Sequence, residues 1–245
     1  ERIVLTDINN TSGVLNFVRY SQENGRVPVV GVDFRNGISC CYVILAKDND
    51  GFLEINRFLS KHTQEALPFP SKAPEFEKCV VIYPWGKEPE LLAEYEFVGV
   101  AVHQLNRFRM NPDKKGKKYV ALQSMTFRSK RDFNTHRLLR AIDQNALLSK
   151  LPVEEQSRED AVFLSRDSLL DRYEEFGELV RRSEEILLTC SIEFGFAPRA
   201  ASQNLALYTD SRENDLELVR SLCEKGLKQR YDTVTTEIKE RIEKE

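Results

Sequence analysis

Six short apolar runs, separated by segments with helical periodicity, fill the first 145 residues of the chain. The runs are Ile3–Leu5, Val27–Phe34, Cys40–Ala46, Cys79–Tyr83, Phe97–Val102 and Tyr119–Leu122. Strands that are apolar throughout are typical of a parallel sheet whose two faces are both covered by helices. The alternation therefore predicts an α/β fold with six strands, either a doubly wound sheet or a barrel.

Helices are expected between these strands. One should begin after Thr11 or Ser12 and end at Gly25, and others should begin after Asp50 and at about residue 131. A short helix is also expected over residues 90–95. The first strand arrives with no helix before it, which suggests that a segment preceding Glu1 is missing.

The character of the chain changes at about residue 151. Residues 151–196 carry 12 acidic and 5 basic side chains, and Ser165 and Ser211 are good N-caps for helices. We therefore expect an α/β domain over residues 1–150 and a helical segment over residues 151–245.

The overall charge excludes several classes of protein. The chain has 36 Lys and Arg residues against 39 Asp and Glu residues, which is not the balance of a strongly basic nucleic-acid wrapper. No apolar run is long enough to span a bilayer, so no membrane partner is expected. The five cysteines form no C-x-x-C pair, which favours reduced thiols in a cytoplasmic protein over disulfides or a cysteine zinc site.

Two aspartates are the sharpest candidates for a functional site. Asp7 and Asp33 each stand at the carboxyl end of a buried strand, where α/β proteins place functional groups. The alternative for Asp7 is a structural one, in which its carboxylate caps the turn through Asn9 and Asn10 or the helix that follows. His103 follows a strand and could line a cleft, whereas His62 and His136 lie in helical stretches and are expected to pack.

Residues 106–140 form the basic segment, with 11 basic and 2 acidic side chains. A cluster of this kind could bind DNA phosphates, and the alternative is a solvated loop that faces the acidic residues 151–196 of the same chain. The candidate DNA-contacting residues are Arg107, Arg109, Lys114, Lys115, Lys117, Lys118, Arg128, Lys130 and Arg131.

Four blocks of the sequence resemble one family. They are LTDINNTSGVLNFVRYSQENGRVPVVGVDF (5–34), YVILAKDNDGFLEINRFLSK (42–61), DFNTHRLLRAIDQN (132–145) and FLSRDSLLDRYEEF (163–176). In this order they resemble the PHP (polymerase and histidinol phosphatase) domain of bacterial DNA polymerase III alpha subunits, and most closely the Bacteroidetes versions. The resemblance implies a seven-stranded, barrel-like (β/α) domain whose first strand precedes Glu1. It also implies that the helical segment after residue 150 leads toward the polymerase palm.

The departures from the family concern its metal ligands. The T-D-H motif reads Thr6-Asp7-Ile8 here, a glutamate is replaced by Asp33, and the late D-x-H motif aligns with Ser124-Met125-Thr126. Aliphatic and hydroxyl groups cannot replace imidazole and carboxylate donors for zinc or manganese. The degenerate motif positions Asp7, Ile8, Asp33, Ser124 and Thr126 therefore imply a domain with no catalytic residue, no metal and no cofactor.

The resemblance implies a role within a larger enzyme. The parent chain would be a DNA-directed DNA polymerase, a nucleotidyltransferase whose Mg²⁺ site lies in a palm domain absent here. This part would be silent and architectural, with the remainder of the polymerase, DNA and a proofreading exonuclease subunit as partners. Two alternatives are a metal-dependent PHP phosphoesterase and a free-standing nucleic-acid-binding module built on the basic segment.

Overall fold

The computed structural model describes residues 1–111, 118–196, 207–231 and 233–244. The chain divides into two compact units, Glu1–Phe194 and Gly195–Glu245.

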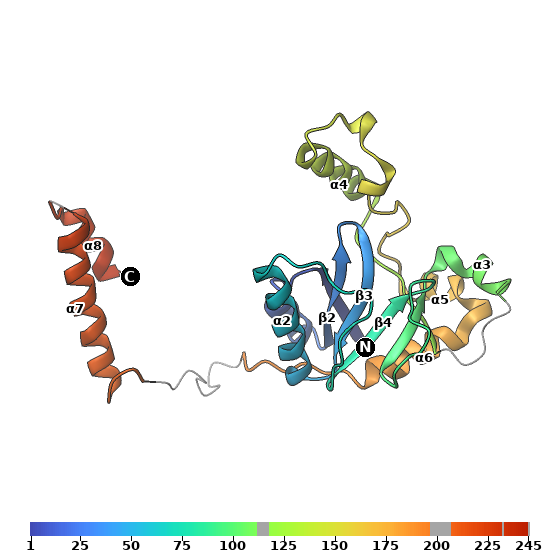
Figure 1. The fold of residues 1–245 in the computed structure, drawn as a ribbon, viewed down its shortest axis with the longest axis horizontal. Helices are drawn as coiled ribbons and strands as arrows, with labels where there is room; N and C mark the ends of the chain where they lie inside the picture. The colour runs from blue at the N-terminus through green and yellow to red at the C-terminus, as the bar shows by residue number, and fades with distance from the viewer. Residues whose placement is uncertain (112–117, 197–206, 232, 245) are drawn as a thin grey trace. The chain divides into compact units, whose positions relative to one another are not determined.

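The first unit is built on a mixed six-stranded sheet (Figure 1). Its strands lie side by side in chain order: β1 (Arg2–Ile8), β2 (Val27–Asn36), β3 (Ser39–Ala46), β4 (Cys79–Pro84), β5 (Glu96–Val100) and β6 (Tyr119–Ala121). Each of the six predicted runs is confirmed as a strand. Among the described residues the sheet is curled and open, with β1 and β6 as its edges, so the seven-stranded barrel stays a prediction.

The prediction of an all-parallel sheet is wrong. β1 and β2 run parallel, as do β4, β5 and β6, but β3 runs antiparallel to both β2 and β4. The reason is the two-residue turn between β2 and β3, because a connection this short can only join antiparallel strands. Gly37 takes the first turn position at φ 60°, a conformation that favours glycine.

Six α-helices are described in the first unit. They are α1 (Val14–Glu23), α2 (Asn49–Gln64), α3 (Leu105–Arg109), α4 (Lys130–Asp143), α5 (Arg166–Arg172) and α6 (Gly177–Leu188). The second unit contains α7 (Arg212–Arg230) and α8 (Thr236–Lys244). No described helix has the length and apolarity that a bilayer crossing requires.

The predicted helix starts are confirmed in part. Ser165 and Ser211 cap α5 and α7 through their side chains, as expected. α1 instead begins after Gly13, and α2 is capped by Asp48, which accepts a hydrogen bond from the backbone of Gly51. The helix predicted over residues 90–95 is wrong, since these residues form bends and a turn. A segment of six residues is too short to stabilise a helix without tertiary support.

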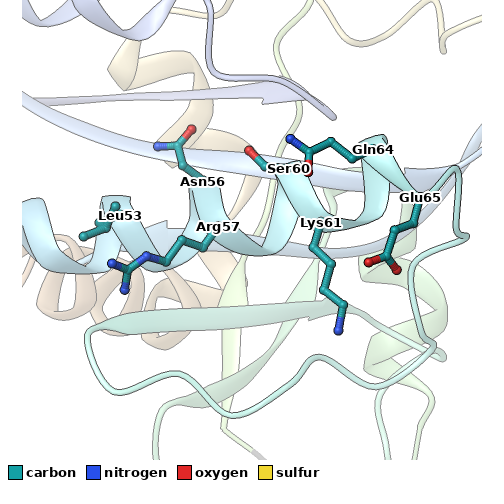
Figure 2. Close-up of a pocket in the computed structure, with 7 residues that line it drawn as sticks. All are labelled: Leu53, Asn56, Arg57, Ser60, Lys61, Gln64 and Glu65. Atoms are coloured by element: carbon teal, nitrogen blue, oxygen red, sulfur yellow. The ribbon is translucent and has the colours of Figure 1, made fainter.

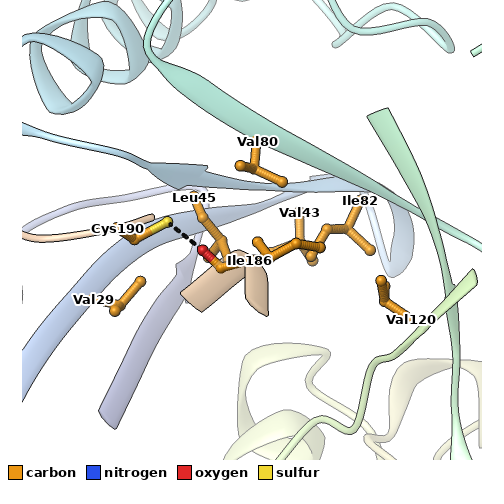
Figure 3. Close-up of a cluster of buried hydrophobic side chains, with 8 residues drawn as sticks. All are labelled: Val29, Val43, Leu45, Val80, Ile82, Val120, Ile186 and Cys190. Atoms are coloured by element: carbon orange, nitrogen blue, oxygen red, sulfur yellow. Dashed lines mark hydrogen bonds between the residues drawn. The ribbon is translucent and has the colours of Figure 1, made fainter. Parts of the chain in front are cut away.

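One side of the sheet is covered by α6. Ile186 and Cys190 pack with Val29, Val43 and Leu45 in a buried apolar cluster that Figure 3 shows. The cluster is completed by Val80, Ile82 and Val120. Hydrogen bonds fix the helix as well, since Arg182 donates to the carbonyl of Tyr119 at 2.9 Å and the amide of Ala121 donates to Ser183 Oγ at 2.9 Å.

Because α6 packs on the sheet, the first compact unit is longer than the predicted α/β domain. The compact unit continues to Phe194, past the boundary expected at residue 150, because α6 completes the apolar face of the sheet. The assignment of residues 1–150 to a PHP domain and of residues 151–245 to a helical extension stays a prediction.

Candidate functional site

Asp7 and Asp33 lie on neighbouring strands but on opposite faces of the sheet. In the parallel register of β1 and β2, Ile8 is the partner of Asp33 and Asp7 is the partner of Val32. Paired residues point to the same face and successive residues to opposite faces. Asp33 therefore shares a face with Ile8, and Asp7 faces the other way, so the two carboxylates do not form one site.

The carboxylate of Asp7 lies beside the start of α1. Its Oδ2 is 2.8 Å from the position that a Cβ atom would take on Gly13. Among the described residues, Asp7 accepts no hydrogen bond, so the prediction that it caps the turn or the helix is wrong. Asn10 takes that role, because its Oδ1 accepts from the backbone N–H of Ser12 at 3.1 Å and from the Ser12 hydroxyl at 2.8 Å.

Asp33 is buried and paired with an arginine on its own strand. The side chain of Arg35 donates to Asp33 Oδ2 from Nε at 3.0 Å and from Nη2 at 2.5 Å. Burial alone would lower the pKa of Arg35, but the hydrogen bond and charge of Asp33 outweigh burial and raise it. The other carboxylate oxygen, Oδ1, is buried and has no hydrogen-bond partner among the described residues.

Asn9 holds the end of β2 in place. Its backbone N–H donates to the carbonyl of Asp33 at 3.1 Å, and its side chain exchanges hydrogen bonds of 2.8 and 2.9 Å with the backbone of Arg35. Asn9 adopts φ 51°, a left-handed conformation that asparagine tolerates better than most residues. The amide side chain thus extends the pairing of β1 and β2 around the buried ion pair.

Cys40 completes the surroundings of Asp33. It is the register partner of Arg35 on β3, and its carbonyl accepts a hydrogen bond from Lys87 Nζ at 2.9 Å. Burial, and then the negative charge of Asp33, raise the pKa of the Cys40 thiol. A raised pKa favours the neutral thiol, which is a weaker nucleophile than the thiolate.

Sequence reasoning missed Arg35, Asn9 and Cys40. A signal for Arg35 was present, since residues i and i+2 of a strand share a face and Arg35 follows Asp33 by two. No comparable signal pointed to Asn9, because its contacts depend on the register of β1 against β2.

The residues at the degenerate motif positions do not fit a metal ion. Ile8 presents an aliphatic side chain beside Asp33, and Arg35 occupies one carboxylate oxygen. Ser124 and Thr126 are exposed, and the backbone of Thr126 donates to the carbonyl of Ala161 at 2.8 Å. Within the described ranges, no three His, Cys, Asp or Glu side chains gather as a metal would require.

The three histidines serve packing or lie at the surface. His62 contacts the carbonyl of Phe58 through Nδ1 at 3.0 Å, and His136 Nε2 accepts from the backbone N–H of Ser157 at 3.0 Å. His103 is exposed near the Arg158–Asp160 pair and lines none of the hollows described here.

Most described members of the basic segment contact acidic, aromatic or backbone groups of the same chain. Arg109 pairs with Glu175, and Lys130 pairs with Glu159 at 3.2 Å. The further contacts are Arg128 with Asp132 at 3.4 Å, Lys118 with the carbonyl of Glu94 at 2.7 Å, and Arg107 over the ring of Trp85 at 5.6 Å. Because Glu159 and Glu175 belong to the acidic residues 151–196, these pairs favour the internal-pairing alternative for Arg109 and Lys130.

The remaining candidate residues are Arg131 and three lysines, and Arg131 has no such contact among the described residues. Arg131 lies at the surface near the start of α4, beside Ser129 and Thr135. Lys114, Lys115 and Lys117 lie outside the described residues. The proposal that they contact DNA stays a prediction.

A shallow hollow also follows the outer side of α2 (Figure 2). It has a volume of about 420 Å³ and is lined by Leu53, Asn56, Arg57, Ser60, Lys61, Gln64 and Glu65. All of these residues come from the helix and its C-cap, and Asn56 is already bonded to Thr11 at 2.7 Å. Nothing in this hollow brings together the groups that a reaction would need.

His136 should make stability depend on pH. Burial, and then the charge of Arg140, lower its pKa in the folded protein, so the neutral ring is favoured there. A lowered histidine pKa contributes stability that is present above the unfolded pKa and is lost as the pH falls through the folded pKa. We expect wild type to lose stability as the pH falls below the usual histidine pKa of about 6.5, and His136→Gln to lose less.

Urea unfolding at several pH values measures this difference. The amide oxygen of the His136→Gln variant can still accept a hydrogen bond from the backbone N–H of Ser157, so the comparison isolates protonation of the ring. If the free energy of unfolding changed equally with pH in the two proteins, protonation of His136 would not be what destabilises the folded state.

The chain is distantly similar to a known protein. No protein-family profile matches the chain. The DNA polymerase III subunit alpha of Buchnera aphidicola subsp. Acyrthosiphon pisum (strain APS) is 20% identical to this chain over an alignment 232 residues long. The alignment covers 78% of this chain. The chain spans 20% of the length of that relative. The match supports a distant relationship to a replication polymerase subunit.

Proposed function

We propose that the chain is the PHP-type part of a DNA polymerase III alpha subunit and that it supports the enzyme without catalysing a reaction itself. The observation that carries the relationship is the similarity over 78% of the chain to an alpha subunit, together with the four ordered blocks. The parent would then be a DNA-directed DNA polymerase, with its Mg²⁺ and palm in another part of the enzyme. Its partners would be the remainder of the polymerase, DNA and a proofreading exonuclease subunit.

The surroundings of Asp33 support the silent role. Hydrolysis of a phosphate ester by a PHP site needs metal ions that activate water. Here Ile8 stands beside Asp33, and the carboxylate is bonded to Arg35. An architectural role is favoured over the phosphoesterase alternative because the side chains that would hold those ions are replaced.

An architectural role also needs a contact surface, and the region of α4 offers one. Phe133 and Ala141 are its buried side chains, whereas large apolar residues on and after the helix are exposed. These residues are Leu138, Leu139, Ile142, Leu147, Leu148 and Val153. Several exposed apolar side chains on one helix and the segment after it suit an interaction site, and we assign them to contact with the remainder of the polymerase.

Metal content and phosphatase activity test the silent role. We expect the purified chain to hold no stoichiometric zinc, manganese or iron, and to hydrolyse no aryl phosphate when manganese is added. The control is Asp7→Ala, which should be equally inactive because Asp7 faces away from Asp33. Turnover by wild type that is lost in a stable Asp7→Ala protein would establish the phosphoesterase alternative.

The polymerase parent needs a separate assay. The full-length gene product should extend a primed DNA template in the presence of Mg²⁺, and the 245-residue chain alone should not. A full-length product that binds neither template nor nucleotides would contradict the proposed parent.

A further inference from the structure

The ion pair at the end of β2 occupies the position where the family resemblance implies a metal ligand. Asp33 stands at the motif position of a family glutamate, and its side chain is only 9% exposed. A carboxylate this deeply buried needs a counter-charge or hydrogen bonds, because desolvation of an unpaired charge is costly. The question is which group supplies that charge in this protein.

Arg35 supplies two hydrogen bonds and a positive charge to the same carboxylate oxygen. Nε and Nη2 both point at Asp33 Oδ2, at 3.0 and 2.5 Å. The guanidinium is itself partly buried, with 23% of its side chain exposed. An arginine is always charged and presents its N–H groups in a fixed fork, so this arrangement neutralises Asp33 without any bound ion.

The remaining neighbours of Asp33 offer few donor atoms to a metal ion. Ile8 from β1 and Val43 from β3 are its register partners, and both are aliphatic. Lys87 donates to the carbonyl of Cys40 at 2.9 Å and so places a second positive charge near the turn. The unpartnered Oδ1 of Asp33 is one oxygen, whereas zinc and manganese take about four or more donors.

We propose that Arg35 is the resident counter-cation of Asp33 and that it has taken over, at this end of the sheet, the structural part of a metal ion's role. An ion pair then stands where the family has a metal ligand, so the ligands have been replaced and not only lost. The Asp33–Arg35 pair lies within β2, and the hydrogen bonds of Asn9 to the backbone of Asp33 and Arg35 tie this end of β2 to the end of β1. This inference concerns the stability of the 245-residue chain, so its failure would leave the proposed polymerase parent untouched.

Thermal unfolding of four proteins tests the proposal: wild type, Arg35→Met, Asp33→Asn with Arg35→Met, and the control Arg57→Met. Arg35→Met leaves Asp33 buried and unpaired, so its Tm should fall by about 5 °C or more. The double variant removes the unpaired charge as well and should recover a measurable part of that loss. Arg57 is exposed on α2, and its replacement should shift Tm by less than about 1 °C.

The same measurement with metals separates the two possible counter-charges. Wild type should show the same Tm in EDTA, in Mn²⁺ and in Zn²⁺. A wild type that is stabilised by either ion, an Arg35→Met protein as stable as wild type, or a double variant no more stable than Arg35→Met would each overturn the proposal. If Arg35→Met does not fold, Arg35→Lys, which keeps the positive charge, must fold, and its failure would count against the proposal.

Discussion

Replacing Gly31 with alanine should destabilise the protein by about 3 kcal/mol or more, because the new methyl group has no space. Gly31 lies in the buried middle of β2, opposite Leu45 of β3. A Cβ atom at this position would overlap the carbonyl oxygen of Ile44 and would lie 2.9 Å from Leu45 Cδ2. Since the first obstacle is backbone, β2 and β3 would have to separate.

Urea unfolding measures the loss, and Gly177→Ala is the matched control. Gly177 begins α6 at φ −53°, and among the described residues nothing beyond its chain neighbours and its own helix backbone lies within 4 Å of its Cβ position. Alanine there should leave stability unchanged or raise it by about 0.5 kcal/mol, since glycine has the poorer helix propensity. Equal stability of Gly31→Ala and wild type would show that β2 and β3 are not as close as described.

The second large effect is expected at a buried tyrosine. The Tyr83 hydroxyl donates to Glu96 Oε1 at 2.8 Å and accepts from the backbone N–H of Ala73 at 3.0 Å. Glu96 is 1% exposed, and its other oxygen accepts from the N–H of Ala93 at 2.7 Å. Tyr83→Phe would leave two buried groups without a partner and should cost about 2–3 kcal/mol.

Tyr42 provides the control for this prediction. Its ring lies 5.8 Å from that of Tyr83 and is equally buried, but its hydroxyl has no hydrogen-bond partner among the described residues. Tyr42→Phe should therefore leave the free energy of unfolding nearly unchanged or raise it slightly, since it removes a buried polar atom that bonds to nothing. Equal losses in the two variants would mean that volume, and not hydrogen bonding, sets the cost.

The local pattern of the sequence was enough to locate the strands. Runs such as Val27–Phe34 and Cys79–Tyr83 became β2 and β4 because a buried strand needs an unbroken apolar segment. Ser165 and Ser211 were identifiable as caps for a similar reason, since a serine hydroxyl can bond the free N–H groups two or three residues along. Both features depend on residues that are neighbours in the chain.

The direction of β3 and the membership of the core required the tertiary structure. Whether a strand runs parallel or antiparallel depends on its connection, and for β3 the two-residue turn at Gly37 decides it. The placement of Ile186 and Cys190 against Val29 joins segments that lie far apart in the sequence. Periodicity shows that a helix has an apolar face but not which sheet that face will meet.

At the candidate site, too, the sequence determined some features and the tertiary structure decided others. The sequence by itself placed Asp7 and Asp33 at the ends of adjacent strands and showed that Ile8, Ser124 and Thr126 cannot hold a metal. Only the register of β1 against β2 decided that the two aspartates face opposite ways, because a shift of one residue reverses the face of every side chain in a strand. The i, i+2 spacing within β2 placed Arg35 on the same face as Asp33, but only the tertiary structure buried that end of the strand and so made the ion pair necessary.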